Sequence, residues 1–150
     1  MDEILTIGLK EIDSIYEFNK ICFENDYFNR DTWLELLDDY RTIVYIISEN
    51  EFIKSFLAIY NWKDEDDYIK IMTIGTHPDY RGNGYAQKLM EYMIGQMTKE
   101  EMYVYKGETR ESNLKMQKIF EKLGYEIIRK VEGYYDNPVE TAYKYSLEIE

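Results

Sequence analysis

The sequence predicts a mixed α/β fold in which strand-like and helix-like segments follow the order β-α-α-β-β-β-α-β-α-β-β. Two observations support this prediction. Short runs of β-branched and apolar residues, bounded by turn residues, alternate with longer stretches that carry apolar residues at helical spacing. The chain has 150 residues with only 2 prolines and 8 glycines. We therefore expect one domain over residues 1–150, with four helices on the faces of a central twisted mixed sheet of about seven strands.

The N-terminal half is expected to supply four of the strands and two helices. Strand-like runs lie at 3–9, 42–48, 52–60 and 68–76. The stretch 10–23 carries apolar residues at helical spacing. Asp31 is expected to cap the second helix, which contains Trp33, Leu34, Leu36 and Leu37. A turn is expected at Glu49–Asn50, and an acidic loop at 61–67.

The C-terminal half is expected to supply two helices and three strands. The first helix presents a core-facing stripe, made of Ala86, Leu89, Met90, Met93, Ile94 and Met97. Ser112 is expected to cap the second helix, and Gly124 to follow its end as a C′ glycine. The apolar face of that helix contains Met116, Ile119, Phe120 and Leu123. Strands are expected at 102–108, 125–131 and 141–149, with a turn at 133–138 between the last two.

Composition excludes several kinds of site. Cys22 is the single cysteine and His77 the single histidine. An internal disulfide and a cysteine-built metal site are therefore excluded, a histidine-rich metal site or a Ser-His-Asp triad is disfavoured, and we expect no metal. The N-terminus, Met1-Asp2-Glu3, does not resemble a signal peptide, and no apolar run of about 18 residues predicts a membrane span. A cytoplasmic location is expected.

The formal net charge is −12, from 30 acidic and 18 basic residues. This charge argues against nucleic acid as the partner, because binding a phosphate backbone requires a basic surface. It either favours encounter with cationic substrates, such as amines and basic peptides, or only keeps the protein soluble.

The segment 77–90, HPDYRGNGYAQKLM, joins a predicted strand to a predicted helix. The first turn of a helix has free N–H groups and a positive dipole end, and glycines let an anion approach them. A phosphate or pyrophosphate is the expected ligand. A Walker loop would end in Gly-Lys-Ser/Thr, whereas Gly84 is followed by Tyr85 and Ala86. A dinucleotide-binding fingerprint would need glycine or alanine at Gln87. A plain glycine-containing turn is the alternative.

The loop matches the pattern Arg/Gln-x-x-Gly-x-Gly/Ala as RGNGYA at 81–86. This resembles the acyl-CoA pyrophosphate loop of the GNAT N-acetyltransferase superfamily. The segment 108–125, ETRESNLKMQKIFEKLGY, also resembles that superfamily. The segment 133–147, GYYDNPVETAYKYSL, is similar to the tail of its protein N-terminal acetyltransferase branch, which includes ribosomal-protein-alanine and archaeal N-terminal acetyltransferases. The resemblance covers nearly the whole chain and implies a single-domain GNAT fold.

The resemblance implies that acetyl-CoA is the cosubstrate and that backbone groups hold it. The N–H groups of the loop would bind the pyrophosphate, and Arg81 would either add charge or remain solvated. The loop residues concerned are Gly82, Asn83, Gly84, Tyr85, Ala86 and Gln87.

The strand end before the loop has a second implied role. By resemblance, Ile74, Gly75 and Thr76 diverge from the next strand, pair with the pantetheine arm and polarise the thioester oxygen. Gly75 agrees with this, because glycine inside a strand is typical of a bulge or a close backbone approach. Asn113 would contact the cofactor arm, or cap a helix beside Ser112.

The resemblance also implies catalytic residues. Glu108 matches the family's catalytic glutamate, which would accept the amine proton directly or through water. Otherwise it is a structural or substrate-binding carboxylate. The family's leaving-group acid is a tyrosine, but the matching residue is Phe120, which has no proton to donate. Either Tyr134 or Tyr135 substitutes, with Tyr125 a weaker candidate, or the thiolate leaves without a dedicated acid.

Two further residues bear on the acceptor. Lys70 lies near the position where N-terminal acetyltransferases often carry a glutamate or histidine. A lysine in the acceptor pocket would repel an ammonium group, unless it points away. His77, before a proline at a strand end, is expected to be a loop residue rather than the base.

The acceptor pocket is expected between the loop at 24–27 and the hairpin that carries Tyr134 and Tyr135. The sequence thus predicts an acetyl-CoA-dependent N-acetyltransferase, acting by direct attack of a primary amine in a ternary complex. A protein or peptide N-terminal amine is the first choice of acceptor, and a polyamine-like small amine is the second. A non-catalytic acyl-CoA-binding module is the third alternative. A groove open at both ends would suit a peptide, and a closed acidic pocket a polyamine. We expect a monomer or homodimer.

Overall fold

The computed structural model, which describes residues 1–62 and 67–150, confirms the predicted order of strands and helices. Among these residues, seven strands form one sheet: β1 (Glu3–Ile7), β2 (Thr42–Glu49), β3 (Phe52–Asn61), β4 (Ile69–Thr76), β5 (Val104–Arg110), β6 (Glu126–Tyr135) and β7 (Glu140–Glu148). The same residues form four α-helices: α1 (Ile12–Cys22), α2 (Arg30–Asp38), α3 (Tyr85–Lys99) and α4 (Leu114–Lys122). Short 3-10 helices occupy Leu9–Glu11 and Pro78–Tyr80.

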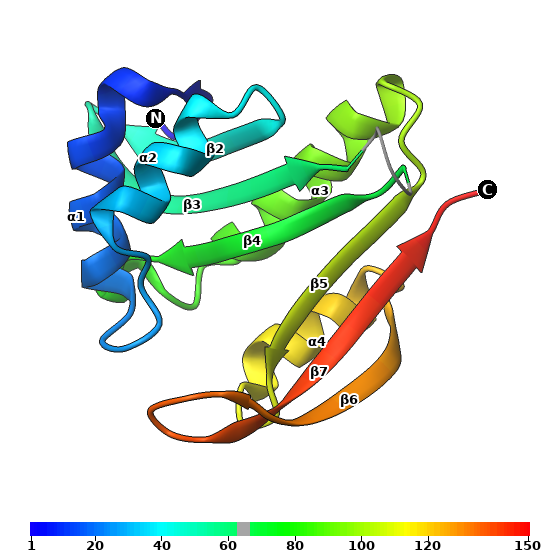
Figure 1. The fold of residues 1–150 in the computed structure, drawn as a ribbon. Helices are drawn as coiled ribbons and strands as arrows, with labels where there is room; N and C mark the ends of the chain where they lie inside the picture. Colours follow the sequence, from blue (N-terminus) through cyan, green and yellow to red (C-terminus); the bar gives the residue numbers. More distant parts are fainter. Residues whose placement is uncertain (63–66) are drawn as a thin grey trace.

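The sheet has the strand order β1-β2-β3-β4-β5-β7-β6 (Figure 1). Neighbouring strands are antiparallel except β4 and β5, which are parallel. These two strands pair only at Ile69 with Tyr105 and at Lys70 with Lys106. Beyond the two pairs they diverge, so the sheet opens between β4 and β5 (Figure 1). The predicted divergence of the strand before the glycine loop is therefore confirmed.

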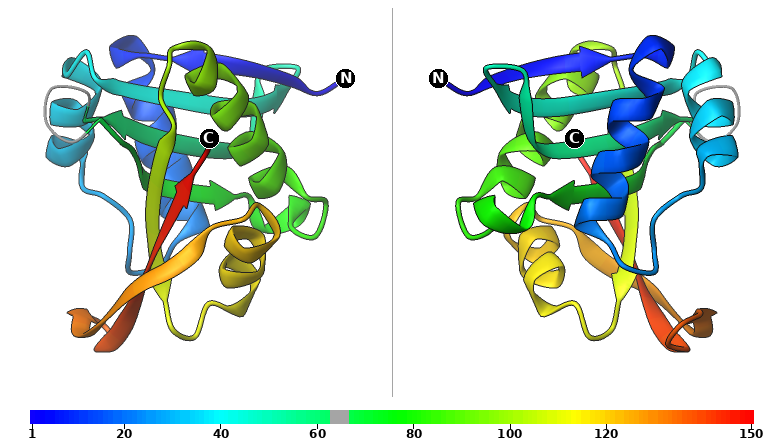
Figure 2. Two further views of the ribbon diagram at one scale, coloured as in Figure 1. Left: turned by 90° about the vertical axis from the view of Figure 1, so that its right-hand side faces the viewer. Right: turned by 90° about the vertical axis from the view of Figure 1, so that its left-hand side faces the viewer.

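Helices lie on both faces of the sheet, but those of the described residues leave part of one face uncovered (Figure 2). α1 and α2 lie on one face of the β1–β4 half, where Phe18, Trp33 and Phe56 form a buried core. α3 and α4 lie on the opposite face, and Phe120 of α4 packs against Tyr145 of β7. Within the described ranges no helix covers the other face of β5 and β7 (Figure 1). Polar side chains on that face are therefore free to form a site.

Two predicted helix caps are wrong by one or two residues. Asn29, and not Asp31, is the N-cap of α2, where its side chain accepts a hydrogen bond at 2.8 Å from the N–H three residues later. Asn113, and not Ser112, caps α4 in the same way at 3.1 Å. Each stretch contains two residues with good capping side chains, and packing decides between them. The N–H of Ser112 donates instead to Glu140 at 2.6 Å.

The last hairpin also differs from the prediction. β6 continues to Tyr135, so Tyr134 and Tyr135 lie in a strand and not in a turn at 133–138. Gly133 has a φ of +66°, and the register between β6 and β7 shifts between Val131 and Tyr135. Glycine at this position distorts the strand without ending it.

Smaller differences lie at other element ends. The predicted first strand ends at Ile7, and the chain then forms a 3-10 turn before α1. Gly124 has a φ of +93° just after the C-cap of α4, which confirms its prediction as a C′ glycine. Of the predicted acidic loop at 61–67, residues 63–66 lie outside the described residues. None of the helices in the described parts of the chain has the length and hydropathy needed to cross a bilayer.

Candidate active site

The glycine loop leads directly into α3, with Gly84 as the N-cap residue. Gly82 and Gly84 have φ values of +85° and +76°, which glycine adopts without strain. Chain neighbours aside, no atom of the described residues lies within 4 Å of a Cβ built on either glycine, so the space above the loop is open. The first turn of α3 contains no acidic residue. Its N–H groups, at Tyr85, Ala86 and Gln87, therefore form an accessible site for an anion.

Arg81 fixes the loop to the end of α1. Its Nε donates to the carbonyl of Thr76 at 3.1 Å, and its Nη2 donates to the carbonyl of Cys22 at 2.9 Å. Both acceptors lie at the last residue of an element, where carbonyl groups lack regular partners. The guanidinium is therefore held by backbone carbonyls, and its contribution to pyrophosphate binding stays a prediction.

Three other side chains of the loop form hydrogen bonds within the protein. These run from Asn83 to the carbonyl of Tyr80 at 2.9 Å, from Tyr85 to Asp2 at 2.9 Å and from Gln87 to Glu91 at 2.8 Å. The part of the loop left for a ligand is therefore its backbone, as expected for a pyrophosphate site.

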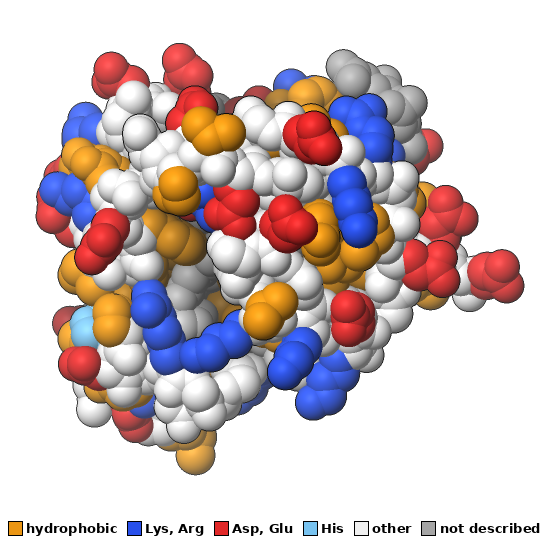
Figure 3. Space-filling view, turned by 90° about the horizontal axis from the view of Figure 1, so that it is seen from below, with side chains coloured by type: hydrophobic (Ala, Val, Ile, Leu, Met, Phe, Trp, Pro, Cys, Tyr) orange, Lys and Arg blue, Asp and Glu red, His pale blue; other side chains and the backbone are white. Residues whose placement is uncertain are grey.

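The end of β4 presents one unpaired edge. Ile74, Gly75 and Thr76 pair with β3 on one side. On the other side, β4 has no strand partner after Lys70 in the part of the chain that the structure describes. Apart from the Thr76 carbonyl, which accepts from Arg81, backbone N–H and C=O groups on this edge are available to an extended ligand. Seen from below, the surface is hollowed left of its centre, with Lys and Arg side chains along one rim (Figure 3).

Gly75 is required by close packing rather than by a bulge. A Cβ at this position would lie 2.9 Å from the Phe56 ring and 3.0 Å from Cys22 and Phe23. The irregularity in the β3–β4 ladder lies at Ala58–Ile59, opposite residues 71–73, and not at Gly75. The glycine therefore makes room for these side chains where the end of α1 meets the end of β4, and the expected close approach of a cofactor backbone stays a prediction.

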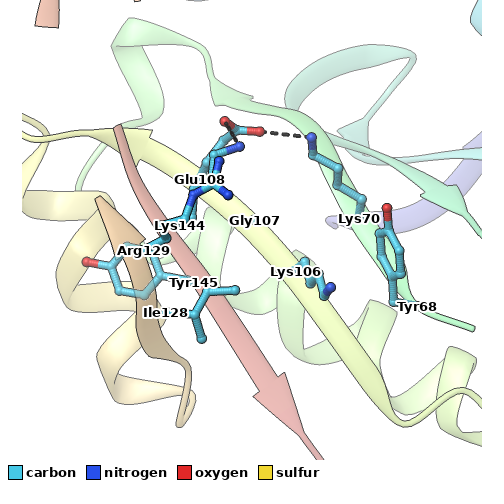
Figure 4. Close-up of a pocket in the computed structure, with 9 residues that line it drawn as sticks. All are labelled: Tyr68, Lys70, Lys106, Gly107, Glu108, Ile128, Arg129, Lys144 and Tyr145. Carbon is cyan, nitrogen blue, oxygen red and sulfur yellow. Dashed lines mark ion pairs between the residues drawn. The ribbon is translucent and has the colours of Figure 1, made fainter. Parts of the chain in front are cut away.

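Glu108 lies on β5 beside the point where β4 diverges. Lys70 Nζ lies 2.9 Å from its Oε1, and Lys144 Nζ lies 3.4 Å from its Oε2 (Figure 4). Lys70 therefore points toward the predicted base and not away from it. Burial disfavours the charged carboxylate, but hydrogen bonds with Tyr134 and Lys70 and the charges of both lysines outweigh it, so the pKa of Glu108 is lowered. Glu108 is ionised at neutral pH.

The two candidate tyrosines lie next to each other on β6. Burial and a hydrogen bond with Glu108 raise the pKa of Tyr134 to about 12. The Tyr134 ring lies edge-on to Tyr135, with centroids 5.1 Å apart, and 4.4 Å from Lys144 Nζ. Tyr135 lies 4.6 Å from the Arg110 guanidinium, and burial raises its pKa as well. Both hydroxyls carry their proton at neutral pH, and Tyr134 is the one whose pKa is coupled to Glu108 through hydrogen bonding.

Phe120 is a core residue beneath β5. It is completely buried and stacks on Tyr145, with centroids 4.4 Å apart. A Cβ at Gly107 would lie 2.8 Å from the tip of its ring, so the glycine makes room for the ring. Tyr125 belongs to the same core cluster. Its hydroxyl has no partner among the described residues, and burial raises its pKa.

A pocket of about 220 Å³ lies over β5 and β7 (Figure 4). It is lined by Tyr68, Lys70, Lys106, Gly107, Glu108, Ile128, Arg129, Lys144 and Tyr145. Four of these residues are basic and one is acidic, so the pocket is not the acidic one expected for a polyamine. The sequence alone did not point to Lys106, Arg129 or Lys144. Strand alternation predicts that residues 106 and 108 share a face, but not which strands lie beside them.

The two loops predicted to form the acceptor site meet at Arg110, whereas the described lining of the pocket over β5 and β7 contains no residue of 24–27 and neither Tyr134 nor Tyr135. Its guanidinium donates to both carboxylate oxygens of Asp26 at 2.9 Å and to Glu140 at 3.1 Å. The side chain of Asn25 also donates to the carbonyl of Asn137 at 3.2 Å. The loop at 24–27 and the β6–β7 turn are therefore tied together, and an acceptor site between them stays a prediction.

The remaining candidates have local contacts. Asn113 caps α4 with its side-chain oxygen, and its contact with a cofactor stays a prediction. His77 begins a 3-10 helix, where its Nδ1 accepts from the N–H of Asp79 at 3.1 Å. It is thus a loop residue, as predicted. Among the described residues, no three His, Cys, Asp or Glu side chains are grouped so as to hold a metal ion.

Known families and solved structures were compared with this fold. The model of the Acetyltransferase (GNAT) family matches residues 10–125. The ribosomal-protein-S18-alanine N-acetyltransferase from Escherichia coli has a TM-score of 0.90 at 20% identity, covering 100% of this chain and 95% of that one. NAA60 from Arabidopsis thaliana, in complex with acetyl-CoA, has a TM-score of 0.85 at 11% identity, covering 99% of each chain.

The NatC complex bound to Gag peptide and CoA gives a TM-score of 0.83 at 20% identity, with 99% of each chain covered. At such identities the structural similarity establishes the fold alone. No curated protein matches the sequence.

Proposed function

The chain belongs to the acetyltransferase (GNAT) family, and from this premise we propose that it transfers an acetyl group from acetyl-CoA to the N-terminal amine of a protein or peptide. The amine attacks the thioester directly in a ternary complex. The chain's own residues hold the donor, favour the neutral amine and accept its proton.

The opening in the sheet between β4 and β5 is the observation that carries this proposal. A free helix N-terminus stands on one side of it, at the start of α3. Glu108 stands on the other side, at the last part of β5. A donor bound along the free edge of β4 would therefore reach the candidate base. A plain glycine turn, the alternative for this loop, would not explain why a carboxylate lies beside a free strand edge.

The residues on the β4 side are suited to acetyl-CoA. When bound, this cosubstrate supplies a thioester carbonyl that an amine can attack. The N–H groups of the first turn of α3 donate to its pyrophosphate. The edge of β4 at 74–76 pairs with the amide groups of the pantetheine arm, and an N–H of that edge polarises the thioester oxygen.

The charges around Glu108 favour a neutral amine. Two ammonium groups, from Lys70 and Lys144, flank the carboxylate. They oppose a third positive charge, so an acceptor ammonium loses its proton more readily here than in water. Glu108 then accepts the amine proton, directly or through water, as the new N–C bond forms. Lys70 repels an ammonium group, and this repulsion helps to activate the amine because it favours the neutral form.

Tyr134 is the proton donor to the leaving thiolate in this mechanism. Its hydroxyl stays protonated because burial and the interaction with Glu108 raise its pKa to about 12. Phe120 has no proton to give. Tyr135 is the second candidate, although its ring is engaged with Arg110.

A peptide amine is favoured over a polyamine by the pocket's charge. Its described lining contains four basic residues and one acidic residue, which repels a polycation. Among proteins of similar fold, one is described as a ribosomal-protein-S18-alanine N-acetyltransferase and another as a complex bound to a peptide and CoA. Both support a peptide acceptor for this chain.

Release of CoA from acetyl-CoA, measured with a panel of acceptors, tests the proposal. The panel contains peptides with free N-termini, the same peptides with blocked N-termini, and a polyamine. We expect turnover with the free peptides and its loss when the N-terminus is blocked.

Turnover with the polyamine alone would overturn the peptide acceptor in favour of a small amine. Tight CoA binding without turnover on any acceptor would overturn catalysis in favour of a binding module. Mass spectrometry of the peptide product locates the added acetyl group.

A further inference from the structure

The pocket over β5 and β7 has a charge opposite to that of the chain. The formal net charge of the chain is −12. The described lining, however, contains one acidic residue, Glu108, and four basic residues: Lys70, Lys106, Arg129 and Lys144. Figure 4 shows Lys70 and Lys144 directed at the carboxylate and Lys106 farther along β5, beside Tyr68. A positive region in an acidic protein attracts anions that the rest of the surface repels.

Like charges face each other across the strands of this pocket. Lys70 pairs with Lys106 between β4 and β5, and Arg129 pairs with Lys144 between β6 and β7. Like charges directly opposite each other destabilise a sheet. Glu108 offsets part of this repulsion because it contacts Lys70 and Lys144. In the described parts of the chain, no ion pair reaches Lys106 or Arg129.

We propose that the acceptor carries carboxylate groups close to its primary amine, as in a peptide whose first residue is followed by aspartate or glutamate. This inference rests on the proposed function, since it takes the amine to be next to Glu108. Lys106 and Arg129 then bind the carboxylates, because Glu108 neutralises neither of them. The repulsion between paired cations is relieved when the acceptor binds.

The spacing on β5 agrees with this binding mode. Lys106 and Glu108 are two residues apart on one face, so their Cα atoms are separated by roughly 7 Å. An extended peptide advances roughly 3.3–3.6 Å per residue. With its amine at Glu108, its second or third residue therefore comes level with Lys106. The ammonium of Lys106 lies 4.4 Å from the Tyr68 ring, which holds the side chain without neutralising it.

The test compares three peptides that share a first residue and differ at the next two, as Glu-Glu, Gln-Gln or Lys-Lys. We expect kcat/KM for the Glu-Glu peptide to exceed that of the Gln-Gln peptide by about tenfold, and the Lys-Lys peptide to be poorest. The preference falls as salt is added, because the charges are partly exposed. Free glutamate in the same assay distinguishes a small acidic amine from a peptide.

Lys106→Met tests the residue assignment. We expect the preference for Glu-Glu over Gln-Gln to fall to about twofold or less. Because the variant removes a like-charge pair, the Tm of the free protein rises by about 1–4 °C. Lys130→Met is the matched control. Lys130 lies beside Arg129 in β6 but outside the pocket lining, and its ammonium is 4.7 Å from the Tyr143 ring. This control leaves the preference unchanged.

Equal rates with the Glu-Glu and Gln-Gln peptides would overturn the inference while leaving the proposed function intact. No transfer to any of the peptides would overturn the proposed function itself. Faster transfer to free glutamate than to any peptide would support the carboxylate site and overturn its assignment to a peptide. If Lys106→Met weakens binding of CoA and keeps the peptide preference, the cations bind a phosphate of CoA, and the inference is wrong.

Discussion

The two sides of the β4–β5 opening are built in different ways. On the β4 side, the candidate donor site consists of backbone groups, from the first turn of α3 and the free edge of β4. On the β5 side, the candidate acceptor site consists of charged side chains from neighbouring strands around Glu108. A backbone site depends on chain conformation, and a side-chain site on charge. The two sides should therefore respond to different substitutions.

Gly84→Val should have the largest effect and should act on the donor side. Gly84 has a φ of +76°, which a β-branched residue does not adopt without strain. The added side chain also covers the N–H groups of α3. Because hydrogen bonds to a charged group are lost, we expect the Kd for acetyl-CoA to rise about 100-fold. Calorimetry measures it.

Gly95→Ala is the control for this substitution. Gly95 lies within α3, and a Cβ at this position would have no described atom within 4 Å beyond its own helix backbone and chain neighbours. Alanine there should leave the Kd unchanged and stabilise the fold by roughly 0.5–1 kcal/mol. If the Gly84→Val protein folds and its Kd for acetyl-CoA is unchanged, the assignment of the loop to the donor site is wrong.

Arg110→Lys should act on the acceptor side. The arginine bonds both oxygens of Asp26 and reaches Glu140 and two backbone carbonyls. One ammonium group does not reproduce this geometry. We expect the KM for the acceptor to rise about tenfold and the Kd for acetyl-CoA to stay unchanged. Arg30→Lys, in an exposed pair with Asp13, should change neither quantity. A larger effect on CoA than on the acceptor would contradict the division into two sides.

Tyr134→Phe should have a smaller effect, on kcat. It removes the hydroxyl that interacts with Glu108, but a thiolate is a good leaving group and needs little help from an acid. We expect kcat to fall about fivefold. Tyr135→Phe should lower kcat less, since its hydroxyl is not the one bonded to Glu108. A larger fall in kcat for Tyr135→Phe than for Tyr134→Phe would assign the role of proton donor to Tyr135.

Titration of the protein's own groups should have the smallest effect, on the pH dependence of the transfer rate. The pKa of Glu108 is lowered and that of Tyr134 is raised to about 12. Glu108 therefore stays ionised and Tyr134 stays protonated between about pH 6 and pH 9. The rate should rise with pH along the titration of the acceptor amine, without a falling limb in that range. Acceptors with different amine pKa values should shift the rise accordingly. If the rate rises at the same pH for all of these acceptors, the titrating group belongs to the protein and not to the acceptor.

The fold and the position of the candidate donor site were largely predictable from local sequence. The alternation of strand and helix patterns predicted every strand and α-helix in order, and RGNGYA marked the junction of β4 and α3 because its residues are contiguous. Element ends were less predictable. Asn29 and Asp31 are both good caps, and the structure has the first as the N-cap, which the sequence alone does not distinguish. Gly133 suggested a turn, but strand pairing with β7 continues past it to Tyr135.

The acceptor side could not be predicted in the same way. Glu108 and Tyr134 were identified through resemblance to a family. Lys144 became part of the site only because β7 lies next to β5 in the sheet. Strand alternation alone does not specify that neighbour. The net charge of −12 did not indicate the basic lining of the pocket, since a net charge does not report where the cations gather.

Glu108→Gln tests the separation of the two sides most directly, when acetyl-CoA affinity and single-turnover transfer to a peptide are measured on the same protein. We predict that the Kd for acetyl-CoA is unchanged and that the transfer rate falls about 100-fold. Glu126→Gln, an exposed glutamate at the start of β6, serves as the control and should change neither value. Full transfer activity in Glu108→Gln, or a loss confined to acetyl-CoA affinity, would contradict the assignment of Glu108 to the acceptor side.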